Sequence, residues 1–207
     1  MSRRAGSGGF VRPSTRIGVL AALALLSVAA PLFAASFEER FAVCLACHGP
    51  GSQSRVPETP SLGGQPQFFV VAQLFLFREG RRSNPAMTAA ATGLTNDDLR
   101  AFAGAIAKLP PPEPPPDPVD PARATRGQTL ARQHHCTVCH NPDFSGRDQM
   151  PRLANQREDY LLKAMREYKA GTRIGYAGAM AVELRDLTDA DLDTLAHFLA
   201  RLPRARE

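Results

Sequence analysis

All four cysteines of the chain lie in two copies of one pentapeptide. Cys44-Leu-Ala-Cys-His48 recurs 92 residues later as Cys136-Thr-Val-Cys-His140. Two thiols three residues apart lie close together on a helical turn, and in each copy a histidine follows directly. Thiols form covalent bonds to carbon or sulfur and also bind metals, while imidazole binds metals. Either bond formation or metal binding is therefore possible chemistry at both motifs.

The spacing of these residues is the attachment pattern of c-type haem. Two such thiols can bond the two vinyl groups of one porphyrin, and the adjacent histidine then faces the iron. The alternatives are a structural zinc site or a disulfide. Zinc sites use cysteine pairs that are usually separated by far fewer residues, and a disulfide would leave the paired histidines unexplained. We therefore predict two covalently bound haem c groups, with thioether bonds at Cys44, Cys47, Cys136 and Cys139 and iron ligands at His48 and His140.

Each iron also needs a ligand on the opposite face of the porphyrin, and the repeat selects Met87 and Met180. They lie 39 and 40 residues after their respective histidines. Small neighbours such as Ala86 and Ala179 let the backbone approach a flat ring, and a thioether is a soft, flexible ligand. The other methionines and histidines fail the test of recurrence, because unlike residues match them in the other copy: Met150, Met165, His134, His135 and His197.

The similarity between the two copies extends beyond the pentapeptides. Pro60-x-Leu-x-x-Gln65 recurs as Pro151-x-Leu-x-x-Gln156. Apolar residues at helical spacing predict helices over residues 67–79 and 157–170, and helix starts are predicted at Ser36, Thr95 and Thr188. No run alternates with period two. The sequence therefore predicts an all-α fold with two tandem domains, at residues 36–109 and 122–207. The segment between them, 110–121, holds eight prolines and is predicted to be an extended spacer.

The amino-terminal 35 residues are predicted to be a secretory signal peptide, because a basic flank precedes an apolar run that ends in Ala34-Ala35. A retained membrane anchor is the alternative, and either choice places the folded part outside the cytoplasm. The formal net charge is +5. The leader contributes four arginines and no acid, so the remainder carries only +1. This small excess argues against nucleic acid as a partner.

With these motifs in view, the chain resembles the dihaem cytochromes c of the c4 type. The resemblance covers about residues 36–207 and rests on both haem motifs, both Pro-x-Leu-x-x-Gln stretches and the Gly80-Arg-Arg82 and Gly171-Thr-Arg173 segments. It implies two class I cytochrome c domains, one covalent haem in each with His/Met ligation, and electron transfer in the periplasm. Asn141 departs from the pattern, since glycine more commonly follows the histidine, as Gly49 does.

Three functions follow from these predictions. The first is a non-enzymatic carrier that passes single electrons between redox proteins, since six-coordinate irons offer no position to a substrate. The second is a haem subunit of a larger dehydrogenase or oxidase complex, which would use the apolar helix around Phe68 and Phe75 as a contact. The third is a dihaem enzyme such as a peroxidase, which requires an open iron, and no clustered carboxylate or histidine suggests one.

Overall fold

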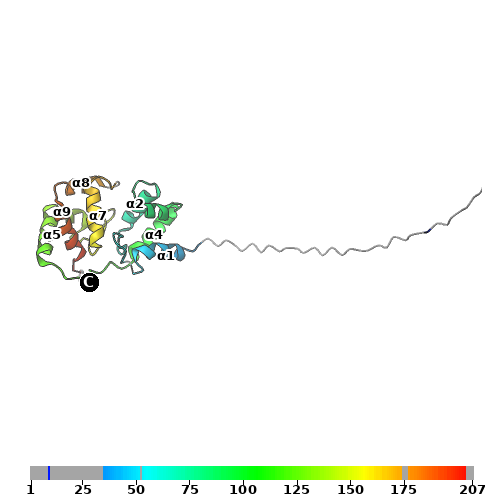
Figure 1. Cartoon of the computed structure of the whole chain (residues 1–207), viewed down its shortest axis with the longest axis horizontal. Coiled ribbons are helices and arrows are strands. Elements are labelled where there is room, and N and C mark those ends of the chain that lie inside the picture. Colours follow the sequence, from blue (N-terminus) through cyan, green and yellow to red (C-terminus); the bar gives the residue numbers. More distant parts are fainter. Residues whose placement is uncertain (1–8, 10–34, 52, 174–176, 204–207) are drawn as a thin grey trace, which may run out of the picture. The chain divides into compact units, whose positions relative to one another are not determined.

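The computed structural model describes residue 9 and residues 35–51, 53–173 and 177–203. The predicted signal peptide therefore lies outside the described residues, apart from Gly9 and Ala35. Within the described ranges the secondary structure is helical except for one isolated β-bridge between Arg147 and Met150. The helices are α1 (Phe37–His48), α2 (Gln67–Arg78), α3 (Pro85–Ala91), α4 (Asn96–Lys108), α5 (Pro121–Gln133), α6 (Cys136–His140), α7 (Glu158–Lys169), α8 (Ala177–Leu184) and α9 (Asp189–Ala200) (Figure 1). Among these described helices, none is both long and apolar enough to cross a membrane.

Residues 35–207 form one compact unit. We call residues 36–109 the first half and residues 122–207 the second half, as the repeat divides them; these bounds remain predictions. In the first half α2 packs on α3 and α4, and in the second half α7 packs on α8 and α9. The order of elements is thus repeated. In addition, α5 packs on α9, and α5 begins at Pro121, the last residue of the predicted spacer.

The predicted helix starts are confirmed. Ser36, Thr95 and Thr188 each form a capping box, in which the side-chain oxygen accepts from the backbone N–H three residues later. The acidic side chain at that third position in turn accepts from the backbone of the capping residue, so two otherwise unpaired donors are satisfied. Helices α2 and α7 are followed by Gly80 and Gly171 with φ of 63° and 69°, a left-handed conformation that favours glycine and ends a helix.

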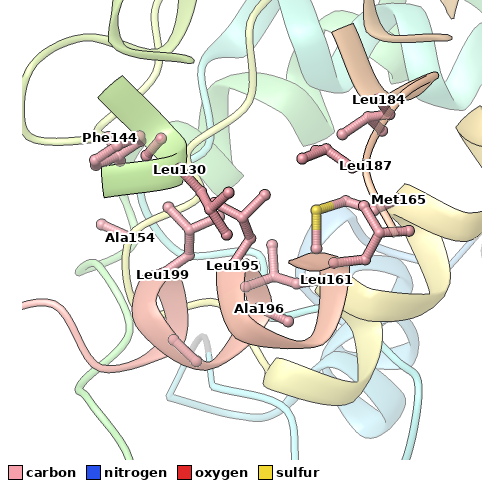
Figure 2. Packing of buried hydrophobic residues seen from close by; sticks show 13 residues of the cluster. Leu130, Phe144, Ala154, Leu161, Met165, Leu184, Leu187, Leu195, Ala196 and Leu199 are labelled. Carbon is pink, nitrogen blue, oxygen red and sulfur yellow. The ribbon is translucent and has the colours of Figure 1, made fainter. Parts of the chain in front are cut away.

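The cores of the two halves differ in size. In the second half, α9 contributes Leu192, Leu195 and Leu199 to a large buried cluster, and Figure 2 shows the side chains of α9 beside those of α5 and α7. Met165 lies in this cluster, 7% exposed, so it is a core residue, which agrees with its exclusion as an iron ligand. Among the described residues of the first half, the contiguous buried cluster is smaller and consists of Val70, Ala103 and Ile106, with partly buried apolar side chains packed against it. A stack of three phenylalanines joins α1 to α4 there: Phe37, Phe41 and Phe102.

Two local features differ from the sequence-based expectation. Their position directly before Cys136 predicts His134 and His135 on the helix that carries the second motif, but they form a turn between α5 and α6, and His135 has φ of 50°. The first motif, by contrast, ends the continuous helix α1. The proline-rich spacer forms no helix or strand over residues 110–120, and its extended conformation stays a prediction. It contacts the first half, because Pro112 is almost fully buried and Gln53 Nε2 donates to Glu113 O at 2.9 Å.

Candidate haem-binding sites

Each half presents its cysteine pair and histidine in the same way. The first thiol of each pair, at Cys44 or Cys136, is half-buried, and the second, at Cys47 or Cys139, is exposed. The histidine that closes each motif is buried, with 7% exposure for His48 and 3% for His140. The described residues contain no group of three or more His, Cys, Asp or Glu side chains arranged to hold a metal ion. The four cysteines are also free of disulfides.

Both histidines are held by a proline carbonyl from the repeated Pro-x-Leu segment. His48 Nδ1 lies 2.7 Å from Pro60 O, and His140 Nδ1 lies 2.9 Å from Pro151 O. A carbonyl can only accept, so Nδ1 carries the proton and donates it, and Nε2 keeps its lone pair. Such a hydrogen bond from the second ring nitrogen fixes the orientation of a metal-binding histidine.

The buried ring nitrogens fit an iron ligand. His140 Nε2 is fully buried and has no hydrogen-bond partner among the described residues. A buried polar atom without a partner costs free energy unless something else occupies its lone pair. Burial lowers the pKa of both His48 and His140, and the bonds to the proline carbonyls only partly oppose this effect. Both rings are thus kept neutral, which is the form that binds a metal.

The backbone directly after each histidine has an unusual conformation. Gly49 has φ of 93°, and a Cβ atom there would lie 2.0 Å from Gln53 O, so the position requires glycine. In the second copy Asn141 has φ of 69°. Its side-chain Nδ2 donates to Ser145 Oγ at 3.0 Å and to Gly146 O at 2.8 Å. These two bonds offset the strain of the left-handed conformation and account for the departure from glycine that the sequence showed.

The half-buried thiols are held in their protonated form. Burial raises the pKa of Cys44, and it raises the pKa of Cys136 to about 11, with a smaller contribution from the carboxylate of Glu183. A thiol with such a pKa is largely protonated at neutral pH, whereas zinc ligation and disulfide exchange need the thiolate.

The predicted methionines lie at equivalent places in the two halves. Met87 is on the short helix α3 and Met180 is on α8, and these helices pack on α2 and α7 respectively. Both side chains are partly buried. Met180 packs against the same apolar cluster as Cys136. Asn84 caps α3 by accepting from Met87 N at 2.9 Å. The sequence predicts the next helices only after Thr95 and Thr188, beyond each methionine, so the short helices α3 and α8 were not predicted.

The other buried histidine has a different role. His197 is 4% exposed, its Nε2 accepts from Asp120 N at 3.2 Å, and its Nδ1 lies 3.5 Å from Glu158 Oε1. Both ring nitrogens are thus engaged, which agrees with its exclusion as an iron ligand.

The functional residues that the sequence did not reveal are the two prolines whose carbonyls accept from the histidines. The recurrence of Pro60 and Pro151 marked both positions as equivalent. It could not show their role, because every residue type has a backbone carbonyl that can accept a hydrogen bond.

Comparisons with known proteins agree with this geometry. The cytochrome c family model matches residues 124–203. A cytochrome c4 of Thiocapsa roseopersicina is 32% identical over 171 residues, which cover 77% of this chain and 87% of that protein. The chain belongs to the cytochrome c4 family. A thiosulfate dehydrogenase electron acceptor of Thiomonas intermedia is 31% identical over 201 residues, covering 92% of this chain and 93% of the relative. The structure of reduced cytochrome c4 from Pseudomonas stutzeri superimposes with a TM-score of 0.71 at 27% identity, over 82% of this chain and 100% of that one.

Membership of the cytochrome c4 family establishes the coarse function. The fold is all-α with two tandem cytochrome c domains, as predicted, and the chain carries two covalently bound haem c groups. It is an electron carrier of the cytochrome c4 type. The buried, neutral histidines and the partnerless His140 Nε2 fit this cofactor. When bound, a haem supplies a one-electron iron couple, and the surrounding protein sets its potential through ligands, hydrogen bonds and burial.

Proposed function

We propose that the chain is a periplasmic carrier that passes single electrons between redox proteins and has no catalytic activity of its own. The observation that carries the proposal is the repeated histidine geometry. In each half a buried imidazole donates from Nδ1 to a proline carbonyl, which leaves Nε2 free to bind an iron. Because this arrangement occurs twice in one chain, two centres can exchange electrons one at a time.

The proposed ligands follow the repeat. His48 and Met87 bind the first iron, and His140 and Met180 bind the second. With both axial positions taken by side chains, the irons have no open position for a substrate, so the chain's residues tune potentials and contact partners. The proposed thioether bonds are at Cys44, Cys47, Cys136 and Cys139.

The proposed partners are redox proteins, and one donor class is suggested by a relative. Since the Thiomonas protein is a thiosulfate dehydrogenase electron acceptor, a thiosulfate dehydrogenase is a candidate donor for this chain as well. The proposed location outside the cytoplasm rests on the predicted signal peptide at residues 1–35. If that segment is retained, it would also attach the carrier to the membrane.

A second candidate function is that of a permanent haem subunit in a larger complex, and the surface of α2 favours it. Phe68 is 69% exposed and Phe75 is 38% exposed. At the equivalent positions of α7 the second half has Asp159 and Arg166. Apolar side chains that stay exposed where the other copy has charges are typical of a contact surface. Purification at the mass of a single chain would argue against this candidate, and co-purification with one stoichiometric partner would favour it.

The experiment that tests the main proposal is expression with export in a host that matures c-type cytochromes. We expect an intact mass that includes two haems, a mature amino terminus near residue 36 and a ferric spectrum with the band of sulfur ligation. Met87→Ala and Met180→Ala should each weaken that band, whereas Met165→Leu, a core substitution, should leave it unchanged. A colourless protein would refute the proposal. Binding of carbon monoxide by the reduced wild-type protein would show an open iron and favour an enzyme.

A further inference from the structure

Two glutamines at equivalent positions of the repeat each bind the backbone of the opposite half. Gln156 Nε2 donates to Ser61 O, and Ser61 N donates to Gln156 Oε1, both at 2.8 Å. Gln65 Nε2 donates to Arg152 O at 3.0 Å, and Arg152 N donates to Gln65 Oε1 at 3.1 Å. Each side-chain amide thus satisfies the N–H and C=O of one residue in the other half. We call these two pairs of hydrogen bonds the amide bridges.

The amide bridges lie in the interior of the protein. Gln65 is 5% exposed, Gln156 is 3% exposed and Ser61 is 1% exposed. Buried amides that make both of their hydrogen bonds fix the relative position of the groups they join, because leaving one unpaired is costly. The amide bridges therefore hold the Pro-x-Leu segment of one half rigidly against the glutamine of the other.

The residues bound by the glutamines directly follow the prolines that hold the histidines. The Pro60 carbonyl and the Ser61 N–H belong to one peptide group, so a single rigid unit accepts from His48 Nδ1 and donates to Gln156 Oε1. In the second half, the peptide group between Pro151 and Arg152 accepts from His140 Nδ1 and donates to Gln65 Oε1. Each histidine is thus joined through one peptide plane to a glutamine of the other half.

This connection has an electronic consequence. When a peptide N–H donates to a good acceptor, the group is polarised and its carbonyl becomes a stronger acceptor. A stronger carbonyl increases the basicity of the imidazole that donates to it from Nδ1, and a more basic ligand stabilises the oxidised metal. The glutamine at the far end of the chain of hydrogen bonds should therefore lower the reduction potential at the iron bound by that histidine.

We propose that Gln65 and Gln156 are positioning residues that tune the haem of the opposite half. Gln65 acts on His140 through the Pro151–Arg152 peptide, and Gln156 acts on His48 through the Pro60–Ser61 peptide. The inference rests on the proposed role of the two histidines as iron ligands. The potential of each centre then depends on the contact between the halves, and separating the halves raises both potentials.

The test compares holoprotein variants by potentiometric titration, with the two haems distinguished by their paramagnetically shifted NMR signals. Gln65→Leu keeps the approximate volume and removes the amide. It should raise the potential of the haem attached at Cys136 and Cys139, shift the ring signals of His140 and leave the other haem unchanged. Gln156→Leu should do the reverse. A shift confined to the variant residue's own half, an equal shift at both haems or no shift would overturn the proposal.

Two further variants keep the test decisive if the leucine substitutions disturb folding. Gln65→Glu retains an oxygen that accepts from Arg152 N–H, so the second haem should keep its potential or move lower; a rise would contradict the proposal. Gln53→Leu is the matched control, because Gln53 also donates from its amide to a backbone carbonyl, that of Glu113, at 2.9 Å. That carbonyl belongs to the spacer and not to a histidine-binding peptide. Gln53→Leu should therefore change the reduction potential of neither haem. The wild-type spectrum, recorded first, shows separately whether histidine ligation itself holds.

Discussion

The hydroxyl of Tyr160 is a sensitive probe of the contact between the halves. Arg82 Nη2 of the first half donates to it at 3.2 Å, and Arg173 Nη2 of the second half donates to it at 3.0 Å. Arg82 and Arg173 are themselves equivalent positions of the repeat, and Arg173 is 6% exposed. Burial alone would raise the pKa of Tyr160, but the charges of the two arginines outweigh it and lower the pKa from 10.0 to about 8.

The pKa of Tyr160 predicts how stability depends on pH. A group whose folded pKa is depressed binds fewer protons when folded, so the free energy of unfolding rises with pH between the folded and unfolded values. For Tyr160 the rise falls between about pH 8 and pH 10. A shift of two pKa units corresponds to at most about 3 kcal/mol. This increment is fully present above pH 10 and is lost as the pH falls through 8.

The assay is chemical denaturation of the holoprotein at several pH values, with tyrosine ring ¹³C NMR to follow the titration directly. One tyrosine should titrate near pH 8, and Tyr160→Phe should remove both that titration and the rise in stability. Tyr168→Phe is the control. The guanidinium carbon of Arg173 also lies over the Tyr168 ring, 4.7 Å from the ring centroid, but this variant keeps the Tyr160 hydroxyl. If every tyrosine titrates above pH 9.5, or if Tyr160→Phe leaves the pH dependence unchanged, the electrostatic reasoning is wrong.

Four substitutions test the fold itself by denaturation. Leu192→Ala removes a side chain with no exposed surface and should cost about 2–5 kcal/mol, whereas Val182→Ala, at a position 55% exposed, should cost less than about 1 kcal/mol. Gly49→Ala must move the backbone near Gln53 and adopt a positive φ, so we expect a loss of more than about 1–2 kcal/mol; a neutral result would show that the loop adapts. Thr188→Ala removes the capping box of α9 and should cost about 1 kcal/mol.

The sequence predicted well those features that depend on neighbours in the chain. The capping boxes at Ser36, Thr95 and Thr188 use residues three positions apart, and the haem motifs are contiguous, so each leaves a complete local pattern. Recurrence in the two copies also selected Met87 and Met180, and their proposed role as ligands remains a prediction.

The features that sequence reasoning missed depend on distant parts of the chain. The side-chain amide of Gln156 forms hydrogen bonds with the backbone of Ser61, which is 95 residues away. No residue pattern near either position predicts this pairing. The left-handed conformation of His135 was likewise not predicted, because it concerns a single residue between two helices, α5 and α6, and no repeated pattern marks it. The spacer was expected to be extended, but its burial at Pro112 depends on the surface that it crosses.

The amide bridges also bear on the order in which the protein folds. They join positions 95 and 87 residues apart, and contacts between such distant positions form late because a long loop must close first. The helices of each half, joined by much shorter connections, can assemble beforehand. We therefore expect an interval during folding in which both halves are largely built but the amide bridges have not yet formed. On this expectation the cofactor can be attached to each half separately, and the proposed tuning of each haem by the opposite half begins only when the amide bridges form.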